Sequence, residues 1–438
     1  MRLFRYLLSL MLVCCATAAA AQSFVTVHGT SLRSPFHEGT AYRFCGTNMW
    51  YATLLARKDD AGNRERLHRE LDRLQAMGID NLRILVGADE LPGTTAHTVT
   101  PCLQDANGRL DKKALEALDY LLAELERRRM VAVLYLNNAW DWSGGYAAYL
   151  RRAGAGIAPS AAGETYNDYV AFCSQFSVNE KAQELYLDFV RRIVSRKNRI
   201  TGKPYAESPA IMAWQVCNEP RPFAAASKRG FFNWIATTAR LIKQLDPNHL
   251  VSVGSEGYYG CEKDMALFEE IHALPEVDYL TIHIWPVNWG WSNRGALFQA
   301  LPRVYIEAEK YIDMHVRVAR RLNKPLVIEE FGYPRDRNFF TPGTTTGARD
   351  GFYAFVMNQW KKQPVIAGLN FWGWAGEGRP GFTRPLPEGD TSREGKTMSE
   401  LAVWQPGDDL LSDPPHEPQG WYSVFDTDTT TIRILQDR

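Results

Sequence analysis

The sequence predicts an α/β protein with a single (β/α)8 (TIM) barrel and long βα loops on the C-terminal face of that barrel. Short β-rich runs alternate with helical stretches along the chain, which is typical of βα units around a parallel sheet. Several of these runs are almost continuously apolar, as parallel strands covered on both faces are. The sequence contains no internal repeat, low-complexity linker or second domain.

The positions of the strands and helices follow from the apolar periodicity. Eight strands are predicted at 43–46, 81–86, 131–136, 211–216, 251–254, 279–283, 326–330 and 368–372. Leucines recur at helical spacing before Gly78 and after a predicted N-cap at Asp111, and further helices are predicted at 180–196, 231–245, 304–322, 349–360 and 427–436. The segments 137–178, 284–303, 331–348 and 373–420 are long and follow strands, so they lie on the face that carries active sites in this fold.

The first residues have the pattern of a secretory signal peptide. Arg2 and Arg5 precede a short apolar run at 7–13, and Ala19 and Ala21 occupy the small-residue positions of a cleavage site. We therefore predict a signal peptide at 1–21 and an exported mature domain at 22–438, in the periplasm or the medium. No other segment reaches the roughly 20 apolar residues of a membrane helix, so no membrane span is expected.

The composition argues against several classes of partner. Lys plus Arg and Asp plus Glu number 50 each, so no net charge favours binding to nucleic acid. The 13 Trp and 19 Tyr suit stacking against the apolar faces of sugar rings. The mature chain has an odd number of cysteines with no metal-site spacing: Cys45, Cys102, Cys173, Cys217 and Cys261. At most two disulfides are expected, with no metal, no cofactor and a monomeric state.

Two glutamates follow predicted strands on opposite sides of the barrel. Glu219 follows strand four and Glu330 ends strand seven. Cleavage of a glycosidic bond needs one carboxyl to protonate the leaving oxygen and another to attack or to activate water. A single glutamate after a strand is also compatible with a helix cap or a salt bridge, so the argument depends on the pair.

The sequences around both glutamates resemble glycoside hydrolase family 5, in the clan of retaining enzymes. Asn-Glu-Pro at 218–220 matches one family motif, and the resemblance implies that Glu219 is the acid/base. Glu-Phe-Gly at 330–332 matches the other and implies that Glu330 is the nucleophile. Glu329 competes for that role, but strand alternation is expected to turn its side chain away from that of Glu330. Arg83, at the end of strand two, matches the arginine that lies beside the nucleophile in this clan.

Other segments resemble the endo-β-1,4-mannanases of the family, in particular a bacterial mannanase subfamily. The run 137–145 is similar to the mannanase segment after strand three, and it places Asn138 and Trp140 among the substrate-binding residues. The resemblance also implies that Asn218 contacts the sugar 2-hydroxyl, that Arg221 contacts sugar on the leaving-group side, and that Trp372 forms the floor of the subsite before the scissile bond. The implied substrates are β-mannan and manno-oligosaccharides.

Two departures from the family pattern are present. The family has His-x-Tyr after strand six, whereas this chain has His283-Ile284-Trp285. Because an indole N–H donates one hydrogen bond and accepts none, Trp285 can still tether a carboxylate. The family's Tyr-Trp after strand one is reversed here as Trp50-Tyr51, which leaves open which ring faces the sugar.

The predicted reaction is retaining endo-hydrolysis of β-1,4-mannosidic bonds in mannan, galactomannan or glucomannan. Three alternatives stay open at this point: an exo-acting β-mannosidase, an endo-β-1,4-glucanase of the same family, and a catalytically dead barrel that only binds carbohydrate. The two enzyme alternatives use the same pair of carboxylates, so the motifs do not separate them.

Overall fold

Eight parallel strands, in chain order, form the centre of the computed structural model, which describes residues 24–37, 39–94, 98–386 and 390–438. They are β3 (Phe44–Asn48), β4 (Asn81–Leu85), β5 (Val131–Tyr135), β6 (Ile211–Gln215), β7 (Leu250–Ser252), β8 (Leu280–Ile284), β9 (Leu326–Phe331) and β10 (Ile366–Phe371). The last strand, β10, pairs with the first, β3, as a barrel requires. The predicted barrel is confirmed, and each predicted strand agrees with the structure to within two residues.

The seam of the barrel lies between β7 and β8. There the backbone N–H of Asp278 donates to the carbonyl of Val251 at 2.8 Å, and the Asp278 carboxylate accepts from the Val251 N–H at 2.6 Å. Further up, the N–H of His283 donates to the carbonyl of Glu256 at 3.1 Å. These contacts hold His283 and Glu256 next to each other at the upper end of the barrel.

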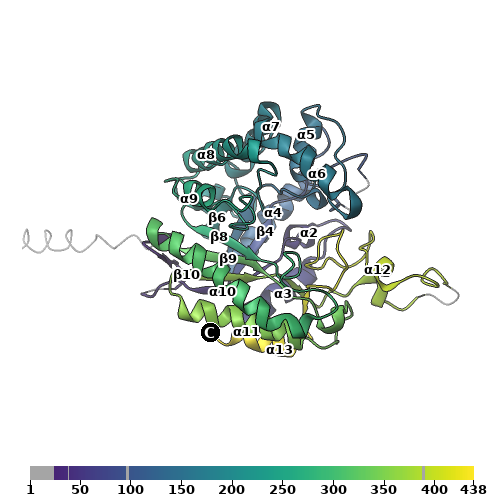
Figure 1. Cartoon of the computed structure of the whole chain (residues 1–438). Helices are drawn as coiled ribbons and strands as arrows, with labels where there is room; N and C mark the ends of the chain where they lie inside the picture. Colours follow the sequence, from purple (N-terminus) through teal and green to yellow (C-terminus); the bar gives the residue numbers. More distant parts are fainter. Residues whose placement is uncertain (1–23, 38, 95–97, 387–389) are drawn as a thin grey trace, which may run out of the picture.

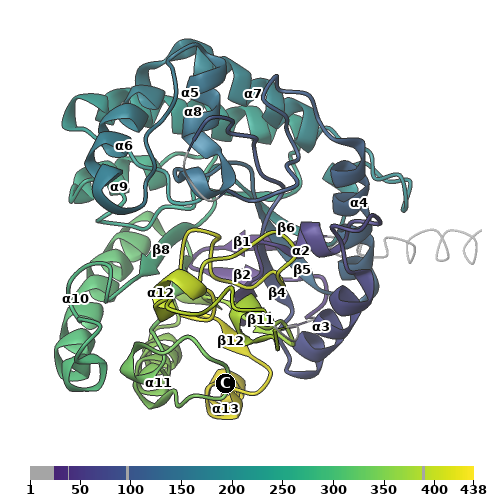
Figure 2. The same cartoon turned by 90° about the vertical axis from the view of Figure 1, so that its right-hand side faces the viewer.

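Helices surround the strands in a ring (Figures 1 and 2). The main ones are α3 (Arg64–Ala76), α4 (Lys112–Arg127), α7 (Glu180–Val194), α8 (Lys228–Leu245), α9 (Met265–His272), α10 (Leu297–Leu322), α11 (Gly347–Lys362) and α13 (Thr429–Gln436). Asp111 caps α4 as predicted, because its carboxylate accepts from the N–H groups of Lys113 and Ala114. Helix α10 begins before the predicted residue 304 and contains Pro302 within it.

The apolar core has an inner and an outer part. Outward-facing strand residues such as Ile282 and Ile328 pack with the helices, whereas Val133, Ala213 and Val327 belong to a separate inner cluster. The hairpin of β1 (Thr26–His28) and β2 (Ser31–Arg33) adds side chains to that inner cluster. The lower barrel is thus filled by apolar groups, and the polar interior lies toward the C-terminal ends of the strands.

The long segments after the strands fold onto one face of the barrel. Segment 137–178 contains α5 (Gly145–Arg152) and α6 (Tyr166–Cys173), and α2 (Ala52–Leu55) follows β3. The segment after β10 contains β11 (Trp374–Gly376), α12 (Met398–Leu401) and β12 (Val424–Phe425), and it crosses this face in front of the strands (Figure 2). This placement agrees with the predicted loops on the C-terminal face.

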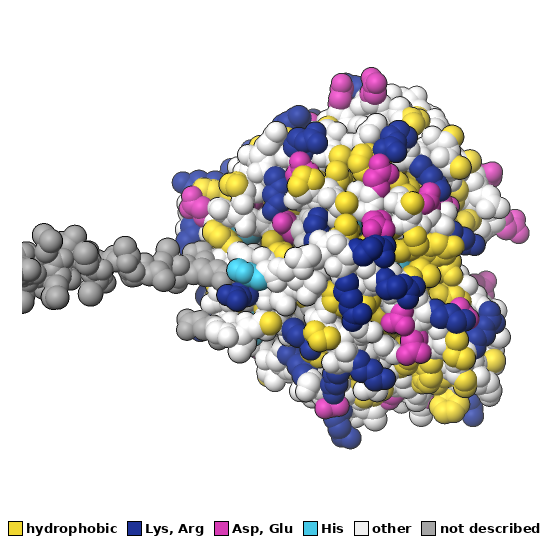
Figure 3. Space-filling model, turned by 60° about the vertical axis from the view of Figure 1, so that its left-hand side comes forward, with side chains coloured by type: hydrophobic (Ala, Val, Ile, Leu, Met, Phe, Trp, Pro, Cys, Tyr) yellow, Lys and Arg dark blue, Asp and Glu magenta, His cyan; other side chains and the backbone are white. Residues whose placement is uncertain are grey.

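Several sequence predictions concern the surface and the cysteines. All five described cysteines are free thiols. Within the described ranges, no helix is both long and apolar enough to span a bilayer. The face shown in Figure 3 carries basic and acidic side chains interspersed with apolar ones. The predicted signal peptide at 1–21 lies outside the described residues.

Candidate active site

Two carboxyl groups and one imidazole meet at the C-terminal ends of the strands. The Nδ1 atom of His283 lies 2.7 Å from Oε1 of Glu219 and 3.2 Å from Oε2 of Glu330. The ligand atoms of the three groups all lie within 4.8 Å of one another. A separation of about 5–5.5 Å suits a retaining glycosidase, whereas inverting enzymes need about 6.5–9.5 Å. Among the described residues this is also the group whose geometry could hold a metal ion, but the Nδ1 atom of His283 already lies against both carboxyls.

The backbone at Glu219 adopts an unusual conformation. Its φ is +48°, in the left-handed region that residues other than glycine and asparagine rarely adopt. The Glu219 N–H donates to the carbonyl of Gly254 at 3.0 Å, and the preceding Asn218 N–H donates to that of Asn137 at 2.8 Å. Neighbouring strand ends therefore hold a conformation that costs about 1 kcal/mol or more, as is common for functional residues.

Strand β9 contains a bulge at the predicted nucleophile. Ile328 pairs with Ile282, but His283 pairs with Glu330, so Glu329 is the extra residue. Because a bulge breaks the alternation of side chains, Glu329 and Glu330 both reach the interior of the barrel. The expectation that alternation separates these two side chains is therefore wrong. Both contact the same guanidinium.

Arg83 is fully buried and bonds the carboxylate of Glu330. Its Nη1 donates to Oε1 of Glu330 at 2.5 Å. The other bonds of the guanidinium go to Oδ1 of Asn48 at 3.1 Å, to Oε1 of Gln215 at 2.8 Å and to Oδ1 of Asn218 at 2.8 Å. The predicted position of Arg83 beside Glu330 is what the structure shows, and the rigid set of acceptors fixes its orientation.

Two indole rings bond the two carboxylates, one each. Nε1 of Trp140 donates to Oε2 of Glu219 at 2.5 Å, and Nε1 of Trp285 donates to Oε2 of Glu330 at 3.1 Å. Trp285 thus has the contact expected of a tether at the position of the family's tyrosine. Trp140, which sequence reasoning placed only among the substrate-binding residues, also bonds a predicted catalytic group.

The charges of the site are coupled through His283. Burial works to raise the pKa of Glu219, but the His283 hydrogen bond and charge, with Arg221 and Trp140, outweigh it and lower that pKa. Burial works to lower the pKa of His283, but Glu330 and Glu219 raise it to about 9. Because the pKa of Glu219 is lowered and that of His283 is raised, the proton between these two groups rests on the imidazole, up to about pH 9.

Arg221 lies beside Glu219 and pairs with an acid that sequence reasoning missed. Its Nε donates to Oε2 of Glu256 at 2.6 Å, and its guanidinium lies 5.4 Å from the ring centroid of Trp140. Burial raises the pKa of Glu256 to about 7. An acidic residue directly after strand five was the signal in the sequence that could have identified it.

Two buried asparagines connect the predicted substrate-binding groups. Oδ1 of Asn138 accepts from Nδ2 of Asn218 at 3.0 Å and from the backbone N–H of Trp140 at 3.1 Å. Asn138 therefore orients its neighbours and bonds Ser143 with its amide nitrogen. Each amide nitrogen carries two hydrogens, so Asn218 keeps one donor for a ligand.

The aromatic residues named from the sequence have different environments. Trp372 is 4% exposed and meets Trp285 edge to face at 5.8 Å, as suits a floor of the site. Trp50 donates to the carbonyl of Ser412, and Tyr51 donates to that of Trp374. Both of these rings are buried, so the reversed Trp-Tyr pair faces the protein.

The C-terminal segment adds groups that the sequence did not indicate. Tyr422 packs edge to face on Trp285 at 5.0 Å, and Arg294 lies 4.1 Å from the ring centroid of Trp421. Burial and the negative charges of Asp413, Glu219 and Glu330 raise the pKa of Glu417 to about 8. Glu417 therefore lies within electrostatic reach of both predicted catalytic acids, in a loop that has no recognisable motif.

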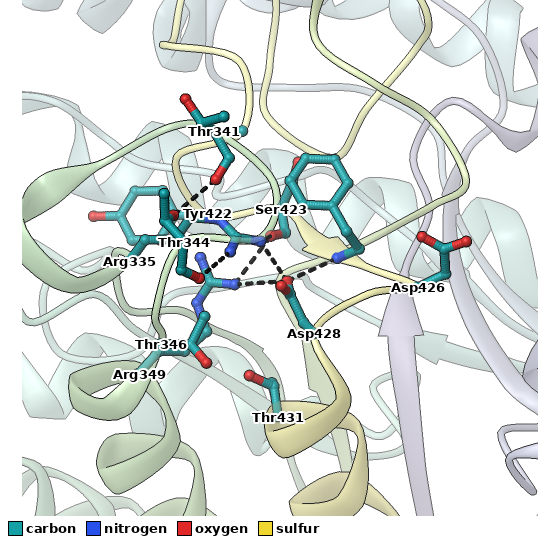
Figure 4. A network of polar contacts seen from close by, with 12 residues as sticks. Arg335, Thr341, Thr344, Thr346, Arg349, Tyr422, Ser423, Asp426, Asp428 and Thr431 are labelled. Atoms are coloured by element: carbon teal, nitrogen blue, oxygen red, sulfur yellow. Dashed lines mark hydrogen bonds and ion pairs between the residues drawn. The ribbon is translucent and has the colours of Figure 1, made fainter. Parts of the chain in front are cut away.

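Two buried arginines anchor this segment (Figure 4). Arg349 donates to the carbonyls of Trp421 and Ser423 at 3.0 Å each, and Arg335 pairs with Asp428. Both guanidinium groups come from the part of the chain that follows β9. The segment that packs on Trp285 is thus fixed by the loop and the helix α11 that follow the strand carrying Glu330.

Comparisons with known proteins match this geometry to one family. A model of β-mannosidase-like proteins of glycoside hydrolase family 5 matches residues 22–438. The chain is 28% identical over 353 residues to mannan endo-1,4-beta-mannosidase 1 of Oryza sativa, which covers 76% of this chain and 73% of the relative. The crystal structure of the glycoside hydrolase family 5 mannosidase from Rhizomucor miehei is 30% identical and has a TM-score of 0.81, covering 96% of this chain and 97% of that one. The endo-1,4-beta-D-mannanase of Thermotoga petrophila shares the fold at 22% identity, with a TM-score of 0.61 and a coverage of 90% and 99%.

Proposed function

The chain belongs to the β-mannosidase-like group of glycoside hydrolase family 5, and from this premise we propose that it hydrolyses internal β-1,4-mannosidic bonds of mannan with retention of configuration. The observation that carries the proposal is the approach of the Glu219 and Glu330 carboxyls to within 4.8 Å, with a guanidinium bonded to only one of them. This arrangement supplies an ionised nucleophile next to a group that can carry a proton.

In the proposed mechanism Glu330 attacks the anomeric carbon while Glu219 protonates the departing glycosidic oxygen. The glycosyl ester on Glu330 is then hydrolysed by a water molecule that gives its proton to Glu219. The proton shared between Glu219 and His283 supplies the acid, and His283 stays within 2.7 Å to accept or return it. Configuration is retained because two displacements occur at the same carbon.

Neighbouring groups bind and orient the substrate in this proposal. Arg83 and Trp285 hold the Glu330 carboxylate, and Trp372 forms the floor beneath the sugar before the scissile bond. Asn218 offers its free amide hydrogen to the 2-hydroxyl, which is axial in mannose. Arg221 contacts the sugar on the leaving-group side.

The test follows viscosity and reducing ends of a mannan solution together. Internal cleavage reduces viscosity before much reducing sugar forms, with mannobiose and mannotriose as late products, and NMR of the first product shows the β-anomer. Glu219→Ala and Glu330→Ala should each remove most activity with the melting temperature nearly unchanged. Activity in Glu330→Ala together with an inactive Glu329→Ala would refute the assignment of the nucleophile.

A second candidate is release of single mannose units from chain ends. It is supported by the similarity to the mannosidase of Rhizomucor miehei and by the segment from β11 to β12 that crosses the barrel face (Figure 2). Mannose as the main early product at constant viscosity would establish it. Faster hydrolysis of soluble cellulose than of mannan would instead indicate a glucanase, and binding without hydrolysis would indicate a dead barrel.

Export completes the proposal. The matched family region begins at residue 22, where the mature chain is expected to start. Mass spectrometry of the N-terminus of the protein secreted by its host tests this boundary, and a retained residue 1 would contradict it.

A further inference from the structure

Glu329 is a buried carboxyl that the proposed mechanism does not use. Its side chain lies inside the barrel, beneath the catalytic groups, and is fully buried. One oxygen accepts from Nε2 of Gln215 at 2.7 Å and lies 3.6 Å from Nε of Arg83, and the other accepts from the hydroxyl of Tyr279 at 3.4 Å. Burying a carboxylate is costly unless its partners are well placed, so a residue of this kind needs an explanation.

The bonds of Gln215 show what Glu329 does to its neighbours. The two hydrogens of the Gln215 amide go to Oγ of Ser252 at 2.9 Å and to Glu329 at 2.7 Å. Only the amide oxygen is left for Arg83, and it accepts from Nε at 2.8 Å. If the amide were flipped, its NH2 group would face the guanidinium. Glu329 therefore selects the orientation of Gln215 that suits Arg83.

Arg83 transmits this orientation to Glu330. Its Nε is held by Gln215, and its Nη1 donates to Glu330 at 2.5 Å. We propose that Glu329 is a positioning residue which, through Gln215 and Arg83, fixes the carboxylate of Glu330 for attack. The proposal rests on Glu330 being the nucleophile of the proposed reaction.

The bulge in β9 makes this relay possible. Val327 belongs to the inner cluster, so ordinary alternation brings Glu329 to the interior two residues later. The bulge then adds Glu330 to the same side, where it pairs with His283. Arg83 thereby contacts the carboxyls of two consecutive residues, Glu329 and Glu330.

Burial and the neighbouring charges determine the protonation of Glu329. The ionisable groups that face it are Arg83 from β4, Tyr279 just before β8, His283 from β8, and Glu330 from its own strand. Burial raises the pKa of Glu329 despite the opposing charges of Arg83 and His283. A protonated carboxyl still has a carbonyl oxygen that accepts from Gln215, so the orienting contact needs an acceptor at this position and does not need a charge.

Two variants separate orientation from charge. Glu329→Met removes the acceptor of Gln215, and we expect kcat to fall about tenfold or more with KM nearly unchanged, because orientation matters in the transition state. Glu329→Gln keeps a carbonyl oxygen that can accept from Gln215 but removes the charge, so its kcat should stay close to that of the wild type. The substrate is manno-oligosaccharide, and the protein is the full mature chain.

Asp119→Asn provides a matched control. Asp119 is also a fully buried carboxyl with an arginine and a tyrosine partner, Arg196 and Tyr205, but it lies on α4. This variant should lose stability while its kcat and pH profile stay those of the wild type. Melting temperatures of all variants show whether they are folded.

Wild-type kcat in a folded Glu329→Met variant would overturn the proposal, as would a kcat that is as low in Glu329→Gln as in Glu329→Met. Failure of the proposed function can be told apart from failure of this inference, because the first is measured as the activity of the wild-type protein and the second as a difference between the variants and the wild type. A wild type that cleaves a β-glucan in place of mannan allows the same comparison on that substrate. A wild type that cleaves no glycoside refutes both proposals together.

Discussion

Replacement of Trp140 by phenylalanine removes one hydrogen bond from Glu219 and keeps an aromatic ring beside Arg221. The lost bond is 2.5 Å long and favours the ionised carboxylate. Hydrogen bonds to charged groups contribute about 1.5–3 kcal/mol, and about 1.4 kcal/mol corresponds to one pKa unit. The pKa of Glu219 should therefore rise by about one to two units in Trp140→Phe. Since the acid must be protonated, the alkaline limb of kcat/KM should move to higher pH.

The assay is the pH dependence of kcat/KM on mannohexaose, and Trp285→Phe is the matched control. Trp285 bonds Glu330 with the same chemical group. Its replacement should lower kcat more than it affects KM and leave the alkaline limb in place. If Trp140→Phe leaves this limb unmoved or shifts it to lower pH, Glu219 is not the group that supplies the proton. A loss of affinity alone in Trp285→Phe would make that ring a stacking platform.

Three further perturbations test the surroundings of the site. In Gly332→Ala the new Cβ would lie 2.6 Å from Cζ3 of Trp285, which displaces the ring that holds Glu330. The kcat should therefore fall on the order of tenfold, and a wild-type kcat would contradict the packing of Trp285 on Gly332. In Arg349→Met three buried carbonyls lose their donor and Asp428 keeps only Arg335 as a cation, so denaturant unfolding should show a loss of about 3 kcal/mol or more. A loss below about 1 kcal/mol would contradict the anchoring role of Arg349. Glu417 has a folded-state pKa of about 8, above that of the unfolded chain, so its contribution to stability is lost as pH rises toward 8. Glu417→Gln should thus unfold at higher temperature than wild type at pH 8 and at the same temperature near about pH 4, and equal melting temperatures at both would contradict the raised pKa of Glu417.

The barrel was predictable because its signals are local. Apolar runs of strand length, helical spacing of leucines and the cap at Asp111 each depend on a few neighbouring residues. The same holds for candidate site residues within or shortly after strands, such as Arg83 and Glu219, because the strands of a barrel converge on one face. These features needed no knowledge of long-range contacts.

The parts that were missed depend on contacts between distant segments. Glu417 lies in a loop without periodicity, and its proximity to the strand ends comes from arginines that anchor the segment from far away in sequence. Similarly, the direction of the Glu329 side chain was mispredicted because alternation holds only in a regular strand, and the bulge is visible only in the pairing of β9 with β8. No single residue type in that strand signals a bulge.

Trp285 stands where the family has a tyrosine, and this exchange depends on the residues around it. A tyrosine hydroxyl can donate and accept and loses its proton near pH 10, whereas the Trp285 N–H only donates and stays neutral. Such a donor keeps an acceptor throughout the proposed cycle, because the ester formed on Glu330 still carries a carbonyl oxygen. The larger ring needs space, which Gly332 leaves beneath it and which Tyr422 closes from the side. Arg349 holds Tyr422 in place by donating to the carbonyls of the residues on either side of it. The position of Trp285, and through it that of Glu330, therefore depends on the C-terminal segment. Changing either Trp285 or this segment alone should displace the nucleophile.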